Sequence, residues 1–245
     1  MTQGRQKHIG LIFPGGGPEG EYYRFERRTG GAIRVYFANS RVGVDAEGGD
    51  HSPESLRETA RIDWITEAAA RIRPLELDAM MWACTSGSFI RGREFAEEQA
   101  ASLAAFAGVP ASSTSLAFVA AARSLGLRKV GVLATYPEAA AKAFAEFLAA
   151  YGLTVDRVDW LGAQSGWDAN LLADDSIERG ARRVASSAVD AVLIPDTALA
   201  ALHLVDALEA ELGRPVITAN AATLWQAQEL AGAHVPVSGL GSLLA

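Results

Sequence analysis

The chain has 245 residues, of which 49% are hydrophobic and 21% are charged, as expected for a globular protein of one large or two small domains. The net charge of −7, without a cluster of lysine and arginine, argues against nucleic acid as a partner. The single cysteine, Cys84, excludes an intrachain disulfide, and the four histidines are too scattered for a zinc site. No apolar run approaches the roughly 20 residues that span a bilayer, and the polar residues 1–8 do not resemble a signal peptide. We therefore expect a cytoplasmic protein without a membrane partner.

Short apolar runs alternate with longer stretches of helical periodicity along the whole chain. In chain order they predict a strand at 9–14, a strand at 33–38, a helix at 54–73 opened by Ser52 and Pro53, a strand at 78–83, a helix at 91–107, an extended segment at 109–113, a helix at 116–125, a strand at 130–135, a helix at 137–151, a strand at 153–158, a helix at 174–185, a strand at 191–195, a helix at 198–212, an extended segment at 216–218 and a helix at 222–231. Strands this apolar are typical of parallel sheets that helices cover on both faces. The sequence therefore predicts an α/β fold.

A weak internal repeat runs through this pattern. The matching segments are LDA at 77–79 with VDA at 189–191, and GVP at 108–110 with GRP at 213–215. Cys84 comes six residues after Asp78, and Asp196 comes six residues after Asp190. The repeat thus predicts that Cys84 and Asp196 occupy equivalent points just past the ends of equivalent strands, where α/β lobes form clefts. The alternative is that two unrelated βαβ units look alike.

The turn that follows the strand at 78–83 has the sequence CTSGS, residues 84–88. Backbone N–H groups at the start of a helix bind anions and lower the pKa of a thiol. We expect a carboxylate held by Thr85, Ser86 and Ser88 to lie beside a reactive Cys84 of low pKa. The alternative is a small buried cysteine next to a serine that caps the helix.

Three other segments carry weaker signals. GGGPEG at 15–20 matches a dinucleotide fingerprint, but Pro18 and the acidic side chains of Glu19 and Glu21 argue against phosphates, so we expect a lid-like loop at 15–25. The Tyr136 phenol follows a strand end and would either donate to a substrate oxygen or serve in packing. The acidic, glycine-rich segment at 45–51, DAEGGDH, is predicted to be a solvated loop, because a metal site there has no partner cluster. The tryptophans are predicted to be core or interface residues, namely Trp64, Trp160, Trp167 and Trp225.

These motifs resemble the aspartate/glutamate racemase superfamily, and within it the branch of maleate cis–trans isomerases and arylmalonate decarboxylases. The likeness covers nearly the whole chain and rests on IGLIFP at 9–14, CTSGSFIRG at 84–92, VGVLATYPE at 130–138, VLIPDTALAAL at 192–202 and GRPVITANAATLWQA at 213–227. It implies two pseudo-symmetric α/β lobes with the active site in the cleft between them. The expected first lobe comprises residues 1–113 and about 219–245, and the second comprises residues 114–218. The resemblance also implies catalysis without a cofactor or a metal.

Members of this superfamily typically use two facing acid/base groups, one from each lobe. Cys84 matches the cysteine of the first lobe, whereas Asp196 stands where the second cysteine is expected. This combination departs from the family's usual arrangements, which have either two thiols or one thiol in the second lobe. By resemblance, the residues that bind the substrate are Pro14, Thr85, Ser86, Tyr136, Asn170 and Thr197.

The expected function is a cofactor-independent isomerase of a small carboxylate or dicarboxylate. Cys84 would be the nucleophile or base, and Asp196 the acid/base on the opposite face. Cis–trans isomerisation is preferred over racemisation, because the retained cysteine resembles the one thought to attack the double bond in maleate isomerases. The alternatives are an arylmalonate-type decarboxylase and a non-catalytic carboxylate-binding protein, while Asp196 has the alternative role of capping the helix predicted at 198–212. Whether the chain forms a homo-oligomer stays an open question.

Overall fold

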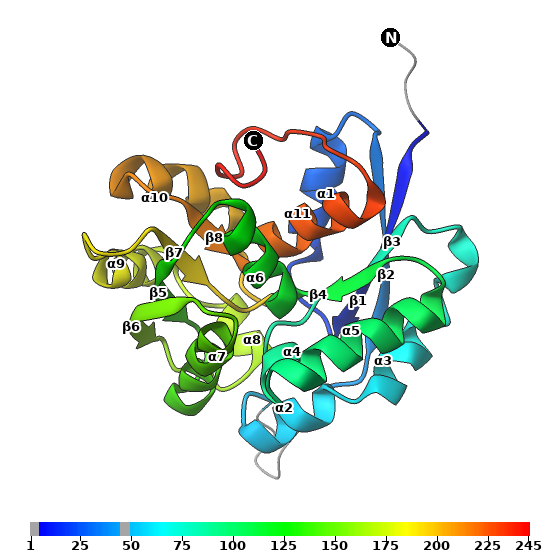
Figure 1. The fold of residues 1–245 in the computed structure, drawn as a ribbon, viewed down its shortest axis with the longest axis horizontal. Coiled ribbons are helices and arrows are strands. Elements are labelled where there is room, and N and C mark those ends of the chain that lie inside the picture. The colour runs from blue at the N-terminus through cyan, green and yellow to red at the C-terminus, as the bar shows by residue number, and fades with distance from the viewer. Residues whose placement is uncertain (1–4, 45–49) are drawn as a thin grey trace.

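The computed structural model describes residues 5–44 and 50–245 and contains two parallel four-stranded sheets flanked by helices (Figure 1). The first sheet has the order β2-β1-β3-β4, with strands Lys7–Pro14 (β1), Ile33–Ser40 (β2), Ala79–Trp82 (β3) and Ala111–Ser113 (β4). The second sheet has the order β6-β5-β7-β8, with strands Lys129–Ala134 (β5), Thr154–Trp160 (β6), Ala191–Ile194 (β7) and Val216–Thr218 (β8). Every strand pair in both sheets is parallel. The predicted α/β fold with parallel sheets is confirmed.

The two sheets follow the same path, which confirms the internal repeat. Asp78 Oδ2 accepts a hydrogen bond of 2.8 Å from a backbone N–H of β1, and Asp190 Oδ2 accepts one of 2.8 Å from a backbone N–H of β5. Each aspartate therefore ties the start of an inner strand to its neighbour. Cys84 and Asp196 each lie two residues beyond the strand that follows, β3 or β7.

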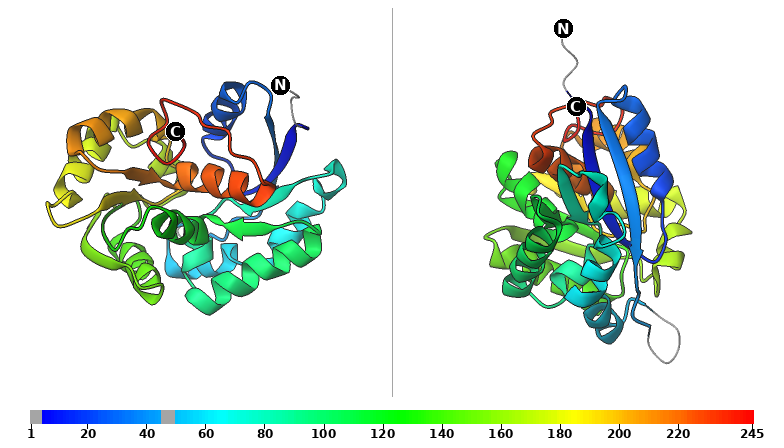
Figure 2. Two further views of the ribbon diagram at one scale, coloured as in Figure 1. Left: turned by 45° about the horizontal axis from the view of Figure 1, so that its top comes forward. Right: turned by 90° about the vertical axis from the view of Figure 1, so that its right-hand side faces the viewer.

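Helices pack against both sheets, and two of them fill the space between the sheets (Figures 1 and 2). In the first half of the chain they are Glu19–Arg28 (α1), Pro53–Thr59 (α2), Ile62–Ala69 (α3), Ser86–Phe89 (α4), Arg93–Ala107 (α5) and Thr114–Ser124 (α6). In the second half they are Glu138–Ala150 (α7), Gly166–Asn170 (α8), Asp174–Val184 (α9), Val205–Leu212 (α10) and Ala219–Ala231 (α11). Short 3-10 helices lie at Arg73–Leu75 and Leu202–Leu204. Helices α6 and α11 each follow the last strand of a sheet and pack on one another. The division into lobes of residues 1–113 with 219–245 and of 114–218 stays a prediction.

The helix predicted at 54–73 is broken into α2, α3 and a 3-10 turn. Ser52 caps α2 as expected, because its side chain accepts a hydrogen bond from Ser55 N. The break follows Ala60, whose carbonyl accepts a hydrogen bond of 2.9 Å from the Gln99 side chain. Arg61 is extended at this point. The Gln99 side chain of α5 thus donates to the Ala60 carbonyl, which would accept a backbone hydrogen bond in a continuous helix.

Two other expectations are corrected by buried contacts of α1. The loop predicted at 15–25 is a loop only up to Pro18, because Tyr22 and Phe25 are spaced on one face of α1 and are buried. The helix predicted at 198–212 begins only with the 3-10 turn at Leu202, whose N–H donates a hydrogen bond of 2.7 Å to Glu21 Oε1. Residues 198–201 therefore form no helix, and this bears on Asp196 below.

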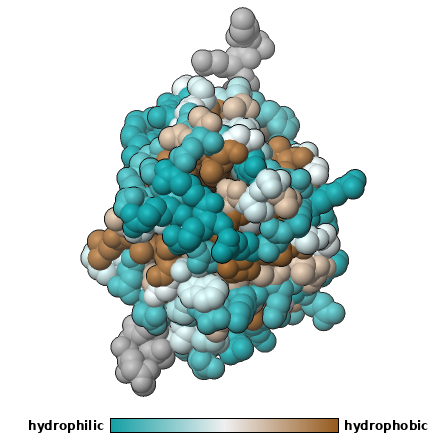
Figure 3. Space-filling view, turned by 90° about the vertical axis from the view of Figure 1, so that its left-hand side faces the viewer, coloured by the Kyte–Doolittle hydropathy of each residue, from teal (hydrophilic) through white to brown (hydrophobic). Residues whose placement is uncertain are grey.

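The surface on the side of α9 and α10 is mostly hydrophilic, and its apolar residues lie in separate patches (Figure 3). The inner strands β3 and β7 are instead buried at every residue, as their continuous apolar sequences predict. Within residues 5–44 and 50–245, no helix has both the length and the apolar character that crossing a bilayer requires.

Candidate active site between the two sheets

A cavity of about 470 Å³ lies where strand ends of both sheets meet. This volume is typical of small-molecule sites. Pro14 borders it at the end of β1, Cys84 after β3 and Asp196 after β7. Six of the predicted site residues line it, namely Pro14, Cys84, Ser86, Asn170, Asp196 and Thr197. The cavity therefore brings together the thiol and the carboxyl group that the repeat made equivalent.

Thr85 and Tyr136, which the resemblance also implied as substrate-binding residues, are buried next to this cavity. Thr85 Oγ1 accepts a hydrogen bond of 3.2 Å from Asp196 N, which joins the turn after β3 to the turn after β7. The Tyr136 hydroxyl forms no hydrogen bond with the described residues, although Thr85 and Ser86 lie near enough to lower its pKa slightly. Burial, with the nearby Asp196 and Cys84, raises the pKa of Tyr136 well above its usual value. Tyr136 is thus a neutral phenol with a hydrogen bond still to donate.

The turn at 84–88 holds the thiol by short-range contacts. Gly87 N donates to Cys84 Sγ at 3.2 Å, and Ser86 Oγ lies 3.8 Å from the same sulfur. Ser88 Oγ donates to the carbonyls of Cys84 and Thr85, at 2.8 Å each. The expectation that Ser88 binds substrate is therefore wrong, because its hydroxyl is fully buried and fixes the backbone of the turn. Ser86 keeps its place at the cavity.

The predicted low pKa of Cys84 is also wrong. Burial, together with the charges of Asp196 and Asp50, raises the pKa of this thiol to about 12. The hydrogen bonds from Gly87 and Ser86 act in the opposite direction but do not offset the burial. Only 3% of Cys84 is exposed, and α4 is a single turn, so the helix start contributes little. The thiol of the free protein carries its proton at neutral pH.

Asp196 is held in a strained backbone conformation with φ of 106°. Non-glycine residues seldom adopt such angles, and they cluster at functional sites. Its Oδ1 accepts a hydrogen bond of 3.0 Å from Ala198 N, and its Oδ2 accepts one from the Thr135 hydroxyl. Burial raises the pKa of Asp196, while His51 and Thr135 lower it. The proposed helix cap is wrong, because the contact to Ala198 closes a local turn and α10 begins only at residue 205.

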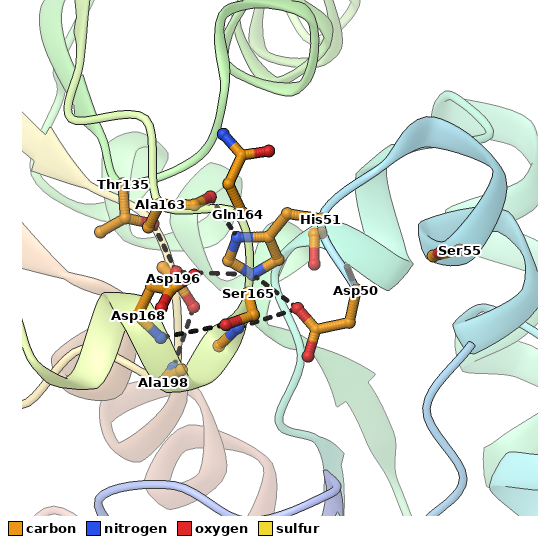
Figure 4. A network of polar contacts seen from close by, with 12 residues as sticks. Asp50, His51, Ser55, Thr135, Ala163, Gln164, Ser165, Asp168, Asp196 and Ala198 are labelled. Carbon is orange, nitrogen blue, oxygen red and sulfur yellow. Dashed lines mark hydrogen bonds and ion pairs between the residues drawn. The ribbon is translucent and has the colours of Figure 1, made fainter. Parts of the chain in front are cut away.

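The sequence analysis missed His51, which it assigned to a solvated loop. Residues 45–49 of that segment lie outside the described residues, but Asp50 and His51 both line the cavity. His51 is 5% exposed, and its Nδ1 lies 2.9 Å from the carbonyl oxygen of Ala163 (Figure 4). Its Nε2 lies 3.7 Å from Asp50 Oδ1 and 3.9 Å from Asp196 Oδ2. No local signal could have found this residue, because Ala163 is 112 positions away in the sequence.

Helix α8 contributes two side chains to the rim of the cavity. Asn170 lines the cavity, as the resemblance implied, and is exposed to solvent. Trp167 also lines it and is 71% exposed, so it is not a core residue, and its alternative as an interface residue stays a prediction. In the part of the chain that the structure describes, no three His, Cys, Asp or Glu side chains are grouped as metal ligands.

The fold and the cavity define a class of α/β protein in which two related sheets meet at a cavity lined by a thiol and a carboxyl group. The sequence profile of the arylmalonate decarboxylase family matches residues 52–244. The chain belongs to this family, which confirms the resemblance found in its motifs.

Individual relatives agree with this assignment. Arylmalonate decarboxylase of Bordetella bronchiseptica is 28% identical over 189 residues, which cover 75% of this chain and 77% of that protein. Maleate isomerase of Alcaligenes faecalis is 23% identical over 137 residues, which cover 56% of this chain and 54% of that protein. Among solved structures, a variant of Nocardia farcinica maleate cis–trans isomerase with a covalently bound succinylcysteine intermediate is similar with a TM-score of 0.88, at 22% identity over 98% of both chains. These relatives are enzymes.

Proposed function

We propose that this protein is a cofactor-independent isomerase that acts at a carbon next to, or conjugated with, a carboxylate group. Cys84 is the nucleophile and Asp196 is the acid/base group on the opposite face. One observation carries the proposal: the single thiol of the chain and Asp196 line one cavity, at equivalent strand ends of two related sheets. The maleate isomerases among its relatives, and the succinylcysteine in one of them, support the addition of a cysteine to a double bond.

A substrate carboxylate in this cavity depends on neutral donors. The lining contains no lysine or arginine among the described residues. Ser86 lines the cavity, and the Tyr136 hydroxyl behind it lacks a partner among the same residues. A buried donor without a partner costs about 1–3 kcal/mol, and a carboxylate oxygen that accepts its hydrogen bond removes this cost. Tyr136 and Ser86 are therefore the proposed carboxylate ligands, together with Thr85.

The reaction begins with the protonated thiol. The S–H bond breaks as the Cys84 sulfur bonds to one carbon of the double bond, and the π electron pair moves to the carbon beside the carboxylate. Asp196 takes part in passing the released proton to that carbon. Rotation about the new single bond and reversal of both steps give the isomer and restore the thiol. Protons and electrons balance without a cofactor.

The apolar part of the lining favours a substrate with an apolar remainder. Phe13, Leu56 and Trp167 form part of the wall, while Asp50 and Asp196 place two carboxyl groups in the same cavity. A second substrate carboxylate would be repelled by these groups unless one of them is protonated. We propose that acids with one carboxylate and an apolar substituent are better substrates than small dicarboxylates.

Decarboxylation of an arylmalonate-type acid is the second candidate function. It is favoured by the family name and by the same apolar wall, which suits an aromatic substituent. A carboxylate pressed against such a wall is poorly solvated and is more readily lost as carbon dioxide. In that case the Cys84 thiol, or Asp196 in its protonated form, would donate the proton to the product.

A screen in deuterated water, followed by proton NMR, distinguishes these functions. The panel contains α,β-unsaturated acids, substituted malonates and amino acids, and the Cys84→Ala variant is the control. The proposal predicts conversion of a cis to a trans acid, lost in the variant. Carbon dioxide release from a malonate would favour the decarboxylase instead. Binding without any conversion across the panel would contradict both and favour a carboxylate-binding protein.

Replacement of Tyr136 by phenylalanine is expected to weaken carboxylate binding without lowering stability. The change removes a buried hydroxyl that has no hydrogen bond partner among the described residues, so the melting temperature should stay the same or rise. Loss of a hydrogen bond to a charged group, worth about 1.5–3 kcal/mol, should raise the Kd of a bound acid roughly 10- to 100-fold. Calorimetric titration and thermal denaturation measure the two effects.

Tyr22→Phe is the matched control for this prediction. Tyr22 is equally buried, but its hydroxyl donates to Asn220 Oδ1 at 2.6 Å and lies outside the cavity lining. Its loss should lower stability by about 0.5–1.5 kcal/mol and leave acid binding unchanged. The assignment of Tyr136 is wrong if both phenylalanine variants bind the acid as the wild type does.

A further inference from the structure

We infer that His51 is a positioning residue that acts through Asp196, by holding the proton that Asp196 exchanges with the substrate. The inference deepens the proposed function and rests on it for the reaction step. It stands on the cluster of Asp50, His51 and Asp196 at the cavity wall (Figure 4).

The position of the proton on the His51 ring follows from its contacts. A carbonyl oxygen can only accept a hydrogen bond, so Nδ1, at 2.9 Å from Ala163 O, carries a proton. Nε2 then turns toward Asp50 Oδ1 at 3.7 Å and Asp196 Oδ2 at 3.9 Å, both beyond ordinary hydrogen bond length. A proton taken up by Nε2 therefore has a carboxylate oxygen on either side of it.

Backbone contacts hold this ring against the opposite half of the molecule. His51 N donates to Gln164 O at 3.1 Å, and Gly166 N donates to Asp50 Oδ1 at 2.8 Å. Together with the bond to Ala163 O, they fix the residues at 50–51 to the loop at 163–166. These contacts orient Nε2 toward Asp196, although residues 50–51 and Asp196 lie far apart in the sequence.

A histidine with only a structural role needs just one of its two nitrogens. Here Nδ1 already anchors the segment, while Nε2 points into a group of ionisable side chains. The titratable groups near the His51 ring among the described residues are Asp50, Asp196, Tyr136, whose ring centre lies 4.9 Å from that of His51, and Cys84, which lines the same cavity. Two carboxyl groups and one imidazole in a partly dry site share protons as a unit.

This unit supplies the proton balance that the proposed reaction needs. When the S–C bond forms, the Cys84 proton leaves the sulfur and enters the pair of His51 Nε2 and Asp196 Oδ2. The pair then releases it to the carbanion carbon, and the reverse reaction returns it to the sulfur. The starting state requires an unprotonated Nε2, so turnover should fall at acidic pH as this nitrogen is protonated.

His51→Asn is the variant that tests the inference. The asparagine amide can take the place of Nδ1–H and keep the bond to Ala163 O, while the ring position of Nε2 is lost. We expect kcat to fall about 10²-fold, the lower end for a positioned acid/base group, with KM unchanged. The pH dependence of kcat should also differ from that of the wild type. His203→Asn is the control, because His203 is exposed and pairs only with Asp174 among the described residues.

A second measurement needs neither substrate nor a stable His51 variant. A pH titration of the wild type followed by nitrogen-15 NMR should show Nδ1 protonated throughout, as its contact with Ala163 O requires, and reports the protonation change of Nε2. In Asp196→Asn, that change should occur at a lower pH, because a neighbouring negative charge has been removed. Identical curves in both proteins would overturn the inference, as would a His51→Asn variant with the wild-type kcat and pH profile. If no acid is converted by the wild type, the proposed function fails, and the NMR comparison alone decides whether the two groups share protons.

Discussion

Replacement of Asp196 by asparagine is expected to lower turnover roughly 10²- to 10⁴-fold, the range for a positioned acid/base group. The melting temperature should change little. An asparagine oxygen can still accept the hydrogen bond from Ala198 N, and its amide can donate to the Thr135 hydroxyl. The variant also removes a buried carboxylate whose desolvation is costly. Steady-state kinetics and thermal denaturation test the two halves of this expectation.

Two further variants serve as comparisons for the activity of Asp196→Asn. Asp174→Asn is the control, because Asp174 is exposed and pairs with His203, and neither residue lines the cavity. Asp196→Cys restores a titratable group and should retain part of the activity or alter the reaction. Full activity of Asp196→Asn would remove this residue from the mechanism and leave a site with a single cysteine.

The thiol of Cys84 should react slowly with iodoacetamide in the free enzyme. A pKa of about 12, against an ordinary value of 9.0, lowers the thiolate fraction about 1000-fold at any pH below the ordinary value. Alkylation near pH 8 should therefore be about three orders of magnitude slower than in the urea-denatured protein, and its rate should still rise above pH 10. Asp196→Asn should react faster than the wild type, because the Asp196 charge raises the pKa of this thiol.

The raised pKa of Cys84 also makes the stability of the folded protein depend on pH. The pKa of the folded thiol is raised, so its contribution to stability is fully present below pH 9.0 and is lost as the pH rises toward about 12. Cys84→Ser should lack this thiol-dependent loss, which denaturant titrations of both proteins at pH 8 and above would measure.

For the alkylation experiment, a rate equal to that of the denatured protein would contradict the buried, protonated thiol.

The amino-acid sequence alone predicts the α/β architecture and the two residues, Cys84 and Asp196, that line the cavity at equivalent strand ends. Apolar runs of four to eight residues favour buried strands, because parallel strands that helices cover on both faces have such sequences. Asp78 and Asp190 mark equivalent strand starts, and each does accept a hydrogen bond from the neighbouring strand. Counting from them predicts Cys84 and Asp196 at equivalent strand ends, and parallel strands present these ends at the same edge of a sheet.

The protonation of these groups depends on contacts that form only in the folded protein. The pKa of Cys84 depends on burial and on Asp196 and Asp50, whereas the local sequence CTSGS suggested a low value. The role of His51 depends on Ala163 and Asp196, which lie more than 100 positions away in the chain. Burial and long-range hydrogen bonds arise only when distant segments pack together, so the residue types at one turn can reveal a site without revealing its protonation.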